Sequence, residues 1–106
     1  MKILHIKHYF ENAGILEMKI LVVKKDDNYP EGIKYSLVFA RKMDDGSYNG
    51  EFLRYDNYNR EGHHRHVKGC KYPYKFEGPE KLVDDFLEDL KKLLQEEGIK
   101  IDWEDM

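Results

Sequence analysis

The sequence has little cysteine, proline and tryptophan, and it has no long apolar run. Its 106 residues include one cysteine, three prolines and one tryptophan. The single cysteine, Cys70, excludes an intrachain disulfide and favours a reducing compartment, so we expect a cytoplasmic protein. No stretch approaches the roughly 18 consecutive apolar residues of a membrane-spanning helix. Histidine and lysine interrupt the first eight residues, so we expect neither a membrane anchor nor a signal peptide there.

Charge is abundant and unevenly distributed. Charged residues make up 37% of the chain and apolar residues 41%, which is typical of one soluble domain, and we expect a single domain over residues 1–106. Residues 79–106 contain ten acidic residues and four lysines, whereas residues 52–76 contain six basic and two acidic residues. The central segment is therefore suited to attract an anion, and the C-terminal segment would repel one.

Alternating apolar and polar residues predict strands at residues 2–10, 15–25, 33–42 and 48–55. The connections between them are short and rich in turn-forming residues, which favours antiparallel pairing. A further short strand is predicted at residues 64–68. Residues 72–76 should be extended, and Pro73 indicates the edge of a sheet.

A long amphipathic helix is predicted after Gly78, which suits the capping position, and Pro79, which suits the first helical turn. Its apolar residues recur at helical spacing, and Gly98 suits the C-terminal cap. The fold class we expect is α+β: an antiparallel sheet of four or five strands with this helix packed on one face. Residues 99–103 are either a last strand or a tail packed on the core. The helical apolar residues are Leu82, Val83, Phe86, Leu87, Leu90, Leu93 and Leu94.

The candidate functional residues gather in residues 54–69, which contain three of the five histidines and three of the four arginines. In a strand, His64 and His66 would point the same way, about 7 Å apart along the chain. Two imidazoles at that spacing can give and take protons around one phosphate. They can also bind one metal ion with a third ligand from Asp56, His63 or His5. A structural or merely exposed pair is the third interpretation.

Other residues of this segment fit an anionic substrate. Arginine side chains, here Arg54, Arg60 and Arg65, present a fork of donors suited to phosphate, although surface salt bridges explain them equally well. The neighbouring residues have similar double interpretations. Asp56 would orient a histidine or form a turn together with Asn57, and Lys68 adds positive charge. The tyrosines around the basic residues would stack on single-stranded bases or serve as strand formers; these are Tyr55, Tyr58, Tyr72 and Tyr74.

Four pieces in order resemble the TumE family of toxin–antitoxin toxins: LRYDN at 53–57, GHHRH at 62–66, YPYKF at 72–76 and LVDDF at 82–86. The resemblance covers roughly residues 33–90. It implies a toxin encoded beside a helix-turn-helix antitoxin, and such toxins usually act on RNA. Many relatives have an acidic residue where this chain has His63, so the resemblance assigns His63 no role. The positions that match the family pattern are Arg54, Asp56, Asn57, His64, Arg65 and His66.

The leading hypothesis is therefore a type II toxin that cleaves RNA as a metal-independent endoribonuclease without a cofactor. His64 and His66 would share the general base and acid roles, in an order the sequence leaves open. Arg65 and Arg54 would stabilise the transition-state charge, and Asp56 would orient a histidine. The alternatives are a non-catalytic module that binds RNA or another anion, and a metal-dependent hydrolase. The expected partners are the antitoxin, RNA and a second copy of the chain in a homodimer. The expected substrate-binding residues are Arg54, Tyr55, Asn57, Arg60, Lys68 and Tyr72.

Overall fold

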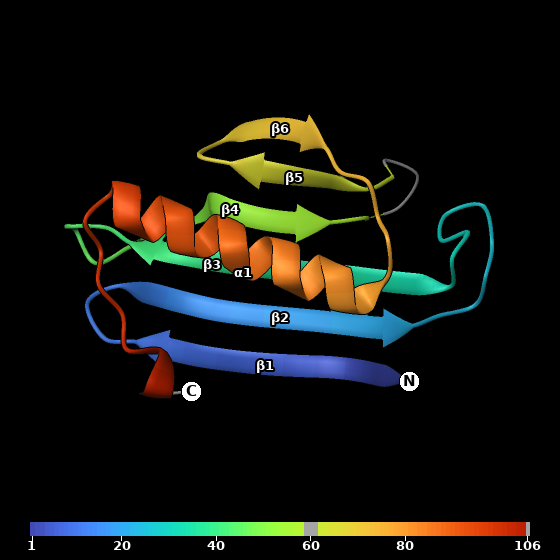
Figure 1. Cartoon of the computed structure of the whole chain (residues 1–106), viewed down its shortest axis with the longest axis horizontal. Helices are drawn as coiled ribbons and strands as arrows, with labels where there is room; N and C mark the ends of the chain where they lie inside the picture. The colour runs from blue at the N-terminus through green and yellow to red at the C-terminus, as the bar shows by residue number, and fades with distance from the viewer. Residues whose placement is uncertain (59–61, 106) are drawn as a thin grey trace.

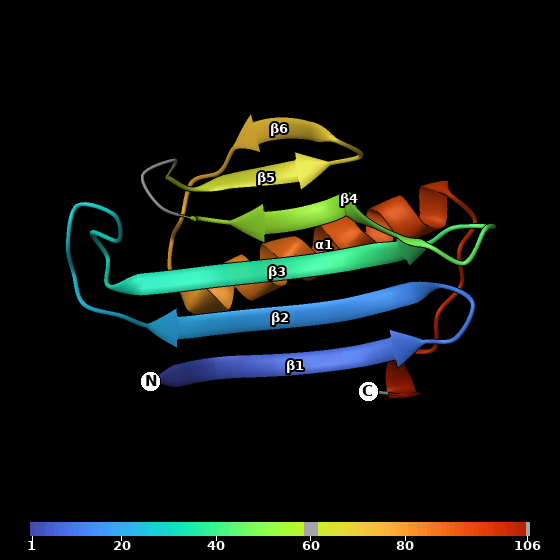
Figure 2. The same cartoon turned by 180° about the vertical axis from the view of Figure 1, so that it is seen from behind.

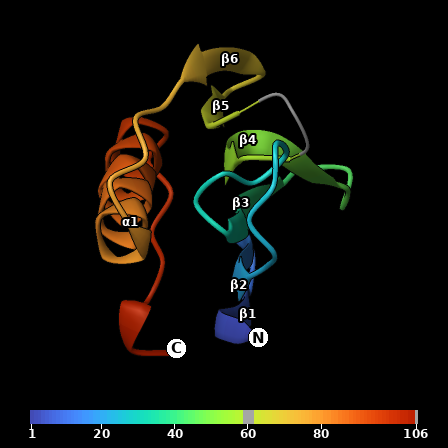
Figure 3. The same ribbon diagram turned by 90° about the vertical axis from the view of Figure 1, so that its right-hand side faces the viewer.

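The computed structural model describes residues 1–58 and 62–105, and it has two layers, a sheet and a helix (Figures 1 and 3). Each strand pairs antiparallel with the next in sequence, so the sheet has the order β1-β2-β3-β4-β5-β6. The strands are β1 (Lys2–Phe10), β2 (Gly14–Val22), β3 (Ile33–Lys42), β4 (Tyr48–Asp56), β5 (His64–Val67) and β6 (Cys70–Pro73). Within the described part of the chain, no helix has the length and apolarity needed to span a membrane.

The α+β class is confirmed, but the expected strand count of four or five is wrong, because the sheet has six strands. β5 and β6 form a hairpin through a two-residue turn at Lys68 and Gly69, whose φ angles are 49° and 83°. Turns with two positive φ angles match the twist of paired strands. Residues 70–73 escaped recognition as a strand because four residues give too short a pattern. Pro73 does lie at the edge of the sheet, as predicted.

Helix α1 (Pro79–Glu96) lies across the middle strands and covers one face of the sheet (Figure 1). It begins as predicted, with Gly78 at the cap and Pro79 in the first turn. Apolar side chains at helical spacing point into the sheet and are almost completely buried. They meet the inward-facing residues of β2, β3 and β4. The buried residues of α1 are Leu82, Phe86, Leu90, Leu93 and Leu94.

The tail after α1 packs on the core and forms no strand, so the second of the two expected alternatives is confirmed. It ends in a short 3₁₀ helix, η2 (Trp103–Asp105). The Trp103 ring lies edge-on to Phe10 of β1, with ring centroids 6.0 Å apart. The tail and α1 therefore lie on the same side of the sheet, and residues 1–58 and 62–105 form no second layer on the opposite face (Figure 2).

The register of β3 and β4 shifts by two residues between Phe39 and Arg41. One residue of β3 there lies opposite three residues of β4, 50–52. Because this bulge interrupts the alternation of β4, both Phe52 and Leu53 belong to the hydrophobic core, whereas only one of two neighbours in a regular strand would face it. The same bulge changes the direction of the residue before Phe52.

Candidate functional site

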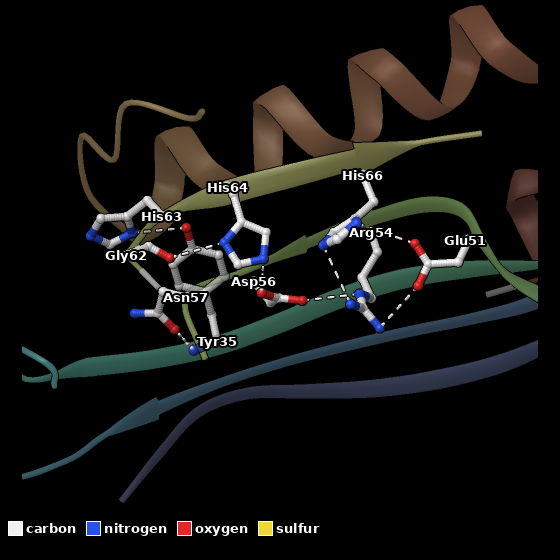
Figure 4. A network of polar contacts seen from close by, with 9 residues as sticks. All are labelled: Tyr35, Glu51, Arg54, Asp56, Asn57, Gly62, His63, His64 and His66. Atoms are coloured by element: carbon white, nitrogen blue, oxygen red, sulfur yellow. Dashed lines mark hydrogen bonds and ion pairs between the residues drawn. The ribbon is translucent and has the colours of Figure 1, made fainter. Parts of the chain in front are cut away.

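The register of β4 and β5 sorts the candidate residues onto two faces. Arg54 lies opposite His66, and Asp56 lies opposite His64. Side chains of paired residues point to the same face of a sheet, and alternate residues point to opposite faces. These four side chains meet on the face that α1 leaves uncovered, where Figure 4 shows them as one connected network.

His64 is held between two acceptors. Its Nε2 lies 2.6 Å from Oδ1 of Asp56, and its Nδ1 lies 3.1 Å from the carbonyl oxygen of Gly62. The Nδ1 contact has hydrogen-bond geometry, whereas the Nε2 contact is a close approach to the carboxylate. His64 and Asp56 are only 3% and 7% exposed. The His64 ring is therefore buried between two oxygen acceptors.

The Arg54 guanidinium contacts Asp56, His66 and Glu51, and so it links the two histidines. Its Nε lies 2.9 Å from Oδ2 of Asp56, and a terminal nitrogen lies 3.3 Å from Nε2 of His66. Its other terminal nitrogen lies 3.4 Å from Oε1 of Glu51. Arg54 Nε and Asp56 Oδ1 are buried, and their contacts depart from hydrogen-bond geometry. Attraction between opposite charges therefore holds this part of the network.

His66 has the opposite environment to His64. Its Nε2 faces a donor, Arg54, and its Nδ1 lies 3.2 Å from Oε2 of Glu51. Burial, followed by the positive charge of Arg54, lowers the pKa of His66 below its ordinary value, although Glu51 and Asp56 oppose this. A neutral ring with its proton on Nδ1 satisfies both contacts, because Nε2 then accepts from Arg54. The His64 and His66 ring centroids are 4.9 Å apart.

Glu51 is a member of this network that sequence reasoning missed. By strand alternation from Leu53, Glu51 would point towards α1. The bulge at residues 50–52 instead directs it to the uncovered face, where it reaches both Arg54 and His66. A bulge of this kind leaves no clear sequence signal, although Gly50 in a strand is compatible with one.

Asp56, His64 and His66 are also the described residues best placed to bind a cation, with ligand atoms within 4.8 Å of one another. Two imidazoles and a carboxylate are suitable ligands for zinc. However, the Arg54 guanidinium contacts both Asp56 and His66, so its positive charge lies against two of the three ligands. A metal ion would have to displace Arg54 from Asp56 and His66 and separate His64 from Asp56. The residues present therefore fit a metal ion poorly.

Arg65 points the other way, towards α1. Its guanidinium pairs with Asp89, which also accepts the hydroxyl hydrogen bond of Tyr55. The Tyr72 ring lies 5.5 Å from the guanidinium carbon. Burial raises the pKa of Tyr55, as does its bond to Asp89. Arg65, Tyr55 and Tyr72 therefore form a separate cluster that joins β4, β5 and β6 to the helix.

Three further candidates also lie outside the network. Asn57 is 3% exposed, accepts the Tyr35 backbone N–H at 2.9 Å and donates to the Ile33 carbonyl at 2.7 Å, so its side chain extends the pairing of β3 beyond the end of β4. Lys68 lies in the β5–β6 turn, with its amine 3.2 Å from a Glu97 carboxylate oxygen. Arg60 lies outside the residues that the structure describes.

His63 belongs to another set of contacts on the helix side of the sheet. Its Nδ1 lies 2.9 Å from the Tyr35 hydroxyl and its Nε2 lies 3.0 Å from Oε2 of Glu31. Its ring stacks on Phe76 at a centroid distance of 4.7 Å. Desolvation raises the pKa of Glu31, but the hydrogen bond with His63, a backbone hydrogen bond and the electrostatic interaction with His63 together outweigh it, so the pKa of Glu31 is lowered overall. His63 and His64 therefore have different partners, although they are adjacent.

Beside the network, the uncovered face has a cavity of about 430 Å³. Arg54 and Asp56 form its border with the network, and the rest comes from β2, β3 and Tyr58. Lys19 and Lys34 line it, and sequence reasoning did not single them out because they come from strands far from residues 54–69. Only the register of the sheet brings them next to Arg54.

Comparison with known proteins gives one match. A family model described as Toxin TumE matches residues 3–94, from β1 into the last turns of α1, and so includes every residue of the network. No curated protein and no solved structure matches the chain. The match covers most of the chain and agrees with the resemblance found in residues 33–90, so the chain belongs to the TumE family of toxins.

Proposed function

We propose that this toxin is an endoribonuclease of a type II toxin–antitoxin system that needs no metal ion, with its site at His64, His66, Arg54 and Asp56. One observation carries the proposal. Two histidines 4.9 Å apart have different partners, two oxygen acceptors for His64 and a donor and an acceptor for His66, and Arg54 contacts both Asp56 and His66. A base, an acid and a fixed positive charge on one face are the groups that RNA transesterification needs.

The different environments of the two histidines support a proposal for the roles that the sequence left open. His66, the neutral ring, takes the proton of a ribose 2′-hydroxyl on Nε2 once the substrate phosphate draws the Arg54 guanidinium to itself. The 2′-oxygen bonds to phosphorus, the bond to the 5′-oxygen breaks, and His64 supplies the proton for that leaving oxygen. The products are a 2′,3′-cyclic phosphate and a 5′-hydroxyl, and solvent restores both rings.

Arg54 stabilises the negative charge of the phosphorane in this scheme, and Asp56 orients His64 through its contact with Nε2. Arg65 was expected to share the first role. Its side chain faces α1 and pairs with Asp89, so we assign it to holding β5 against the helix. With Arg65 in this structural role, all the side chains of the proposed chemistry lie on the uncovered face.

The test is cleavage of a 5′-labelled single-stranded RNA in the presence of a metal chelator. His66→Ala should lower kcat/KM about 100- to 10,000-fold, the range for loss of a general base, and His64→Ala should have a similar effect. His5→Ala is the matched control, because His5 is an exposed histidine of β1, separated from β5 by three strands, and has a partner of its own, Glu17. Circular dichroism checks that each variant is folded.

Three outcomes would contradict the proposal: full activity of a folded His66→Ala protein, loss of wild-type activity in chelator, or cleavage of RNA with 2′-deoxyribose at the cut position. The second would favour the metal-dependent alternative. A different observation favours a non-catalytic RNA-binding module, because both nitrogens of His64 are engaged and its ring is almost completely buried. That module would bind RNA and yield no products.

A toxin of this family implies an antitoxin partner, and we propose that it carries a helix-turn-helix domain. Glu80, Asp84 and Glu88 form an exposed acidic stripe along α1, which supports contact with a basic segment of such a partner. Co-purification with the product of the adjacent gene checks this, and failure to associate would contradict it. The homodimer stays a prediction, and sedimentation equilibrium measures whether two copies of the chain associate.

A further inference from the structure

The cavity beside the site is open to solvent on the face that carries the proposed chemistry. It has a volume of about 430 Å³, and β2, β3 and β4 form its floor. Its walls combine positive charge with an aromatic ring and a leucine. The lining residues that matter here are Lys19, Leu21, Lys34, Ser36, Arg54 and Tyr58.

The charge of this cavity is positive. Neither Lys19 nor Lys34 forms an ion pair with a carboxylate of residues 1–58 or 62–105. The one acidic residue of the lining, Asp56, already pairs with His64 and Arg54. Two amines without counter-ions beside a guanidinium create a site that favours an anion.

The aromatic wall is suited to a flat partner. Tyr58 is 59% exposed, and the Lys34 amine lies 5.6 Å from the centroid of its ring. An exposed tyrosine beside a lysine can stack on an unpaired nucleobase while the amine contacts the neighbouring phosphate. A base inside a duplex has no free face for such contact, so this wall discriminates in favour of single strands.

The cavity also lies in line with the proposed chemistry. Lys19 pairs across the sheet with Ser36, Ser36 with Asp56, and Asp56 with His64. Neighbouring strands are about 4.8 Å apart, so this row extends about 14 Å from the first lysine to the histidine. A strand of RNA laid along the row would place one phosphate at the histidines and the next nucleotide in the cavity.

We infer that the cavity is a subsite for the nucleotide adjacent to the cleaved phosphate of single-stranded RNA. Tyr58 stacks on the base, and Lys19 and Lys34 hold the phosphate. The inference rests on the proposed function for the position of the cleaved phosphate. It assigns binding, and no proton transfer, to these three residues.

The experiment measures binding of a fluorescent single-stranded RNA in the His66→Ala background, where no cleavage is expected. Adding Lys19→Ala and Lys34→Ala together should weaken binding at least about 10-fold and reduce the slope of log Kd against log salt by about 1.4, the value for two lost phosphate contacts on a single strand. Lys75→Ala with Lys100→Ala removes the same charge outside the cavity and should leave the slope unchanged.

Tyr58 is tested in the same background. Tyr58→Ala should weaken binding about 5- to 100-fold, and Tyr58→Phe should keep near-normal affinity, because stacking needs the ring and not the hydroxyl. A double-stranded RNA of the same length should bind with little dependence on Tyr58.

Several results would overturn the inference. The first is that both the double-lysine variant and the Tyr58→Ala variant bind single-stranded RNA with an affinity within twofold of the parent. The second is that polyglutamate of equal length displaces the RNA as readily as unlabelled RNA does. The second would point to an acidic protein segment as the occupant. If the variants lose binding while wild-type protein cleaves nothing, the cavity stands as a binding site for single-stranded RNA, and the proposed chemistry fails together with the position of a cleaved phosphate beside it. If wild-type protein cleaves RNA and binding is unchanged in the variants, only the subsite fails.

Discussion

At the scale of single residues, the main result is that two histidines two positions apart have opposite surroundings. His64 faces two acceptors, and His66 faces a donor and an acceptor. The spacing predicted that both would lie on one side of a strand, and the register confirms it. Their different partners could not be predicted, because one of them is Glu51, which reaches the site only through the β4 bulge.

The pKa of His66 leads to a prediction about stability. Because this pKa is lowered in the folded protein, the unfolded chain binds the proton first as the pH falls through the ordinary histidine value near 6.5. The unfolding free energy should therefore fall on acidification from pH 7.5 to pH 5.5. His66→Gln removes this contribution, so the variant should lose less stability than the wild type over the same interval.

Urea denaturation at several pH values measures this effect without any assay of activity. Identical pH dependence in the wild type and in His66→Gln would show that burial and Arg54 do not depress the His66 pKa. The comparison is differential, so carboxylates with lowered pKa values, such as Asp85, contribute equally to both proteins.

At the scale of elements, strand and helix periodicity predicted most of the fold. The predicted strand at residues 33–42 and the helix beginning at Pro79 agree with the structure, because each has a long run of one period. β6 was missed because its four residues are all exposed and show no alternation. The site is distributed over β4, β5 and the bulge between β3 and β4, and only pairing registers define it.

One close approach between elements has a testable effect. β2 begins at Gly14, and a Cβ atom there would overlap the carbonyl oxygen of Ala40 and lie 2.9 Å from the ring of Phe39. Gly14→Ala should therefore lower the unfolding free energy by about 1–3 kcal/mol, the cost of overpacking a rigid site. Gly50→Ala is the control, because a Cβ there meets nothing within 4 Å. Thermal denaturation followed by circular dichroism measures both, and equal melting temperatures would contradict the expected crowding.

At the scale of the whole molecule, the second layer consists of α1 and the C-terminal tail, and all of it lies on one side of the sheet (Figure 3). Trp103 attaches the tail through its ring contact with Phe10, and the amine of Lys91 lies 5.6 Å from its ring centroid. The sequence left the tail undecided between a strand and a packed segment, because residues 99–103 alternate too briefly to separate the two.

Removing this attachment should weaken the whole domain. Trp103→Ala should lower the unfolding free energy by about 1–3 kcal/mol, less than for a fully buried tryptophan, because the side chain is half-buried. Trp103→Phe should retain most of the stability through the remaining ring contact. Since Trp103 is the sole tryptophan, far-UV circular dichroism is the appropriate probe. A Trp103→Ala protein as stable as the wild type would mean that the tail adds nothing to the core.

The uncovered face of the sheet also affects how the molecule can change over generations. In β4, Leu53 and Tyr55 are buried against the helix, while Arg54 and Asp56 belong to the polar network. Alternate positions of one strand are thus under separate constraints, one set by packing against the helix and the other by the contacts of the polar network. Mutations at every second residue can alter the uncovered face while the residues packed against the helix stay the same, so this face can change over generations without loss of the core.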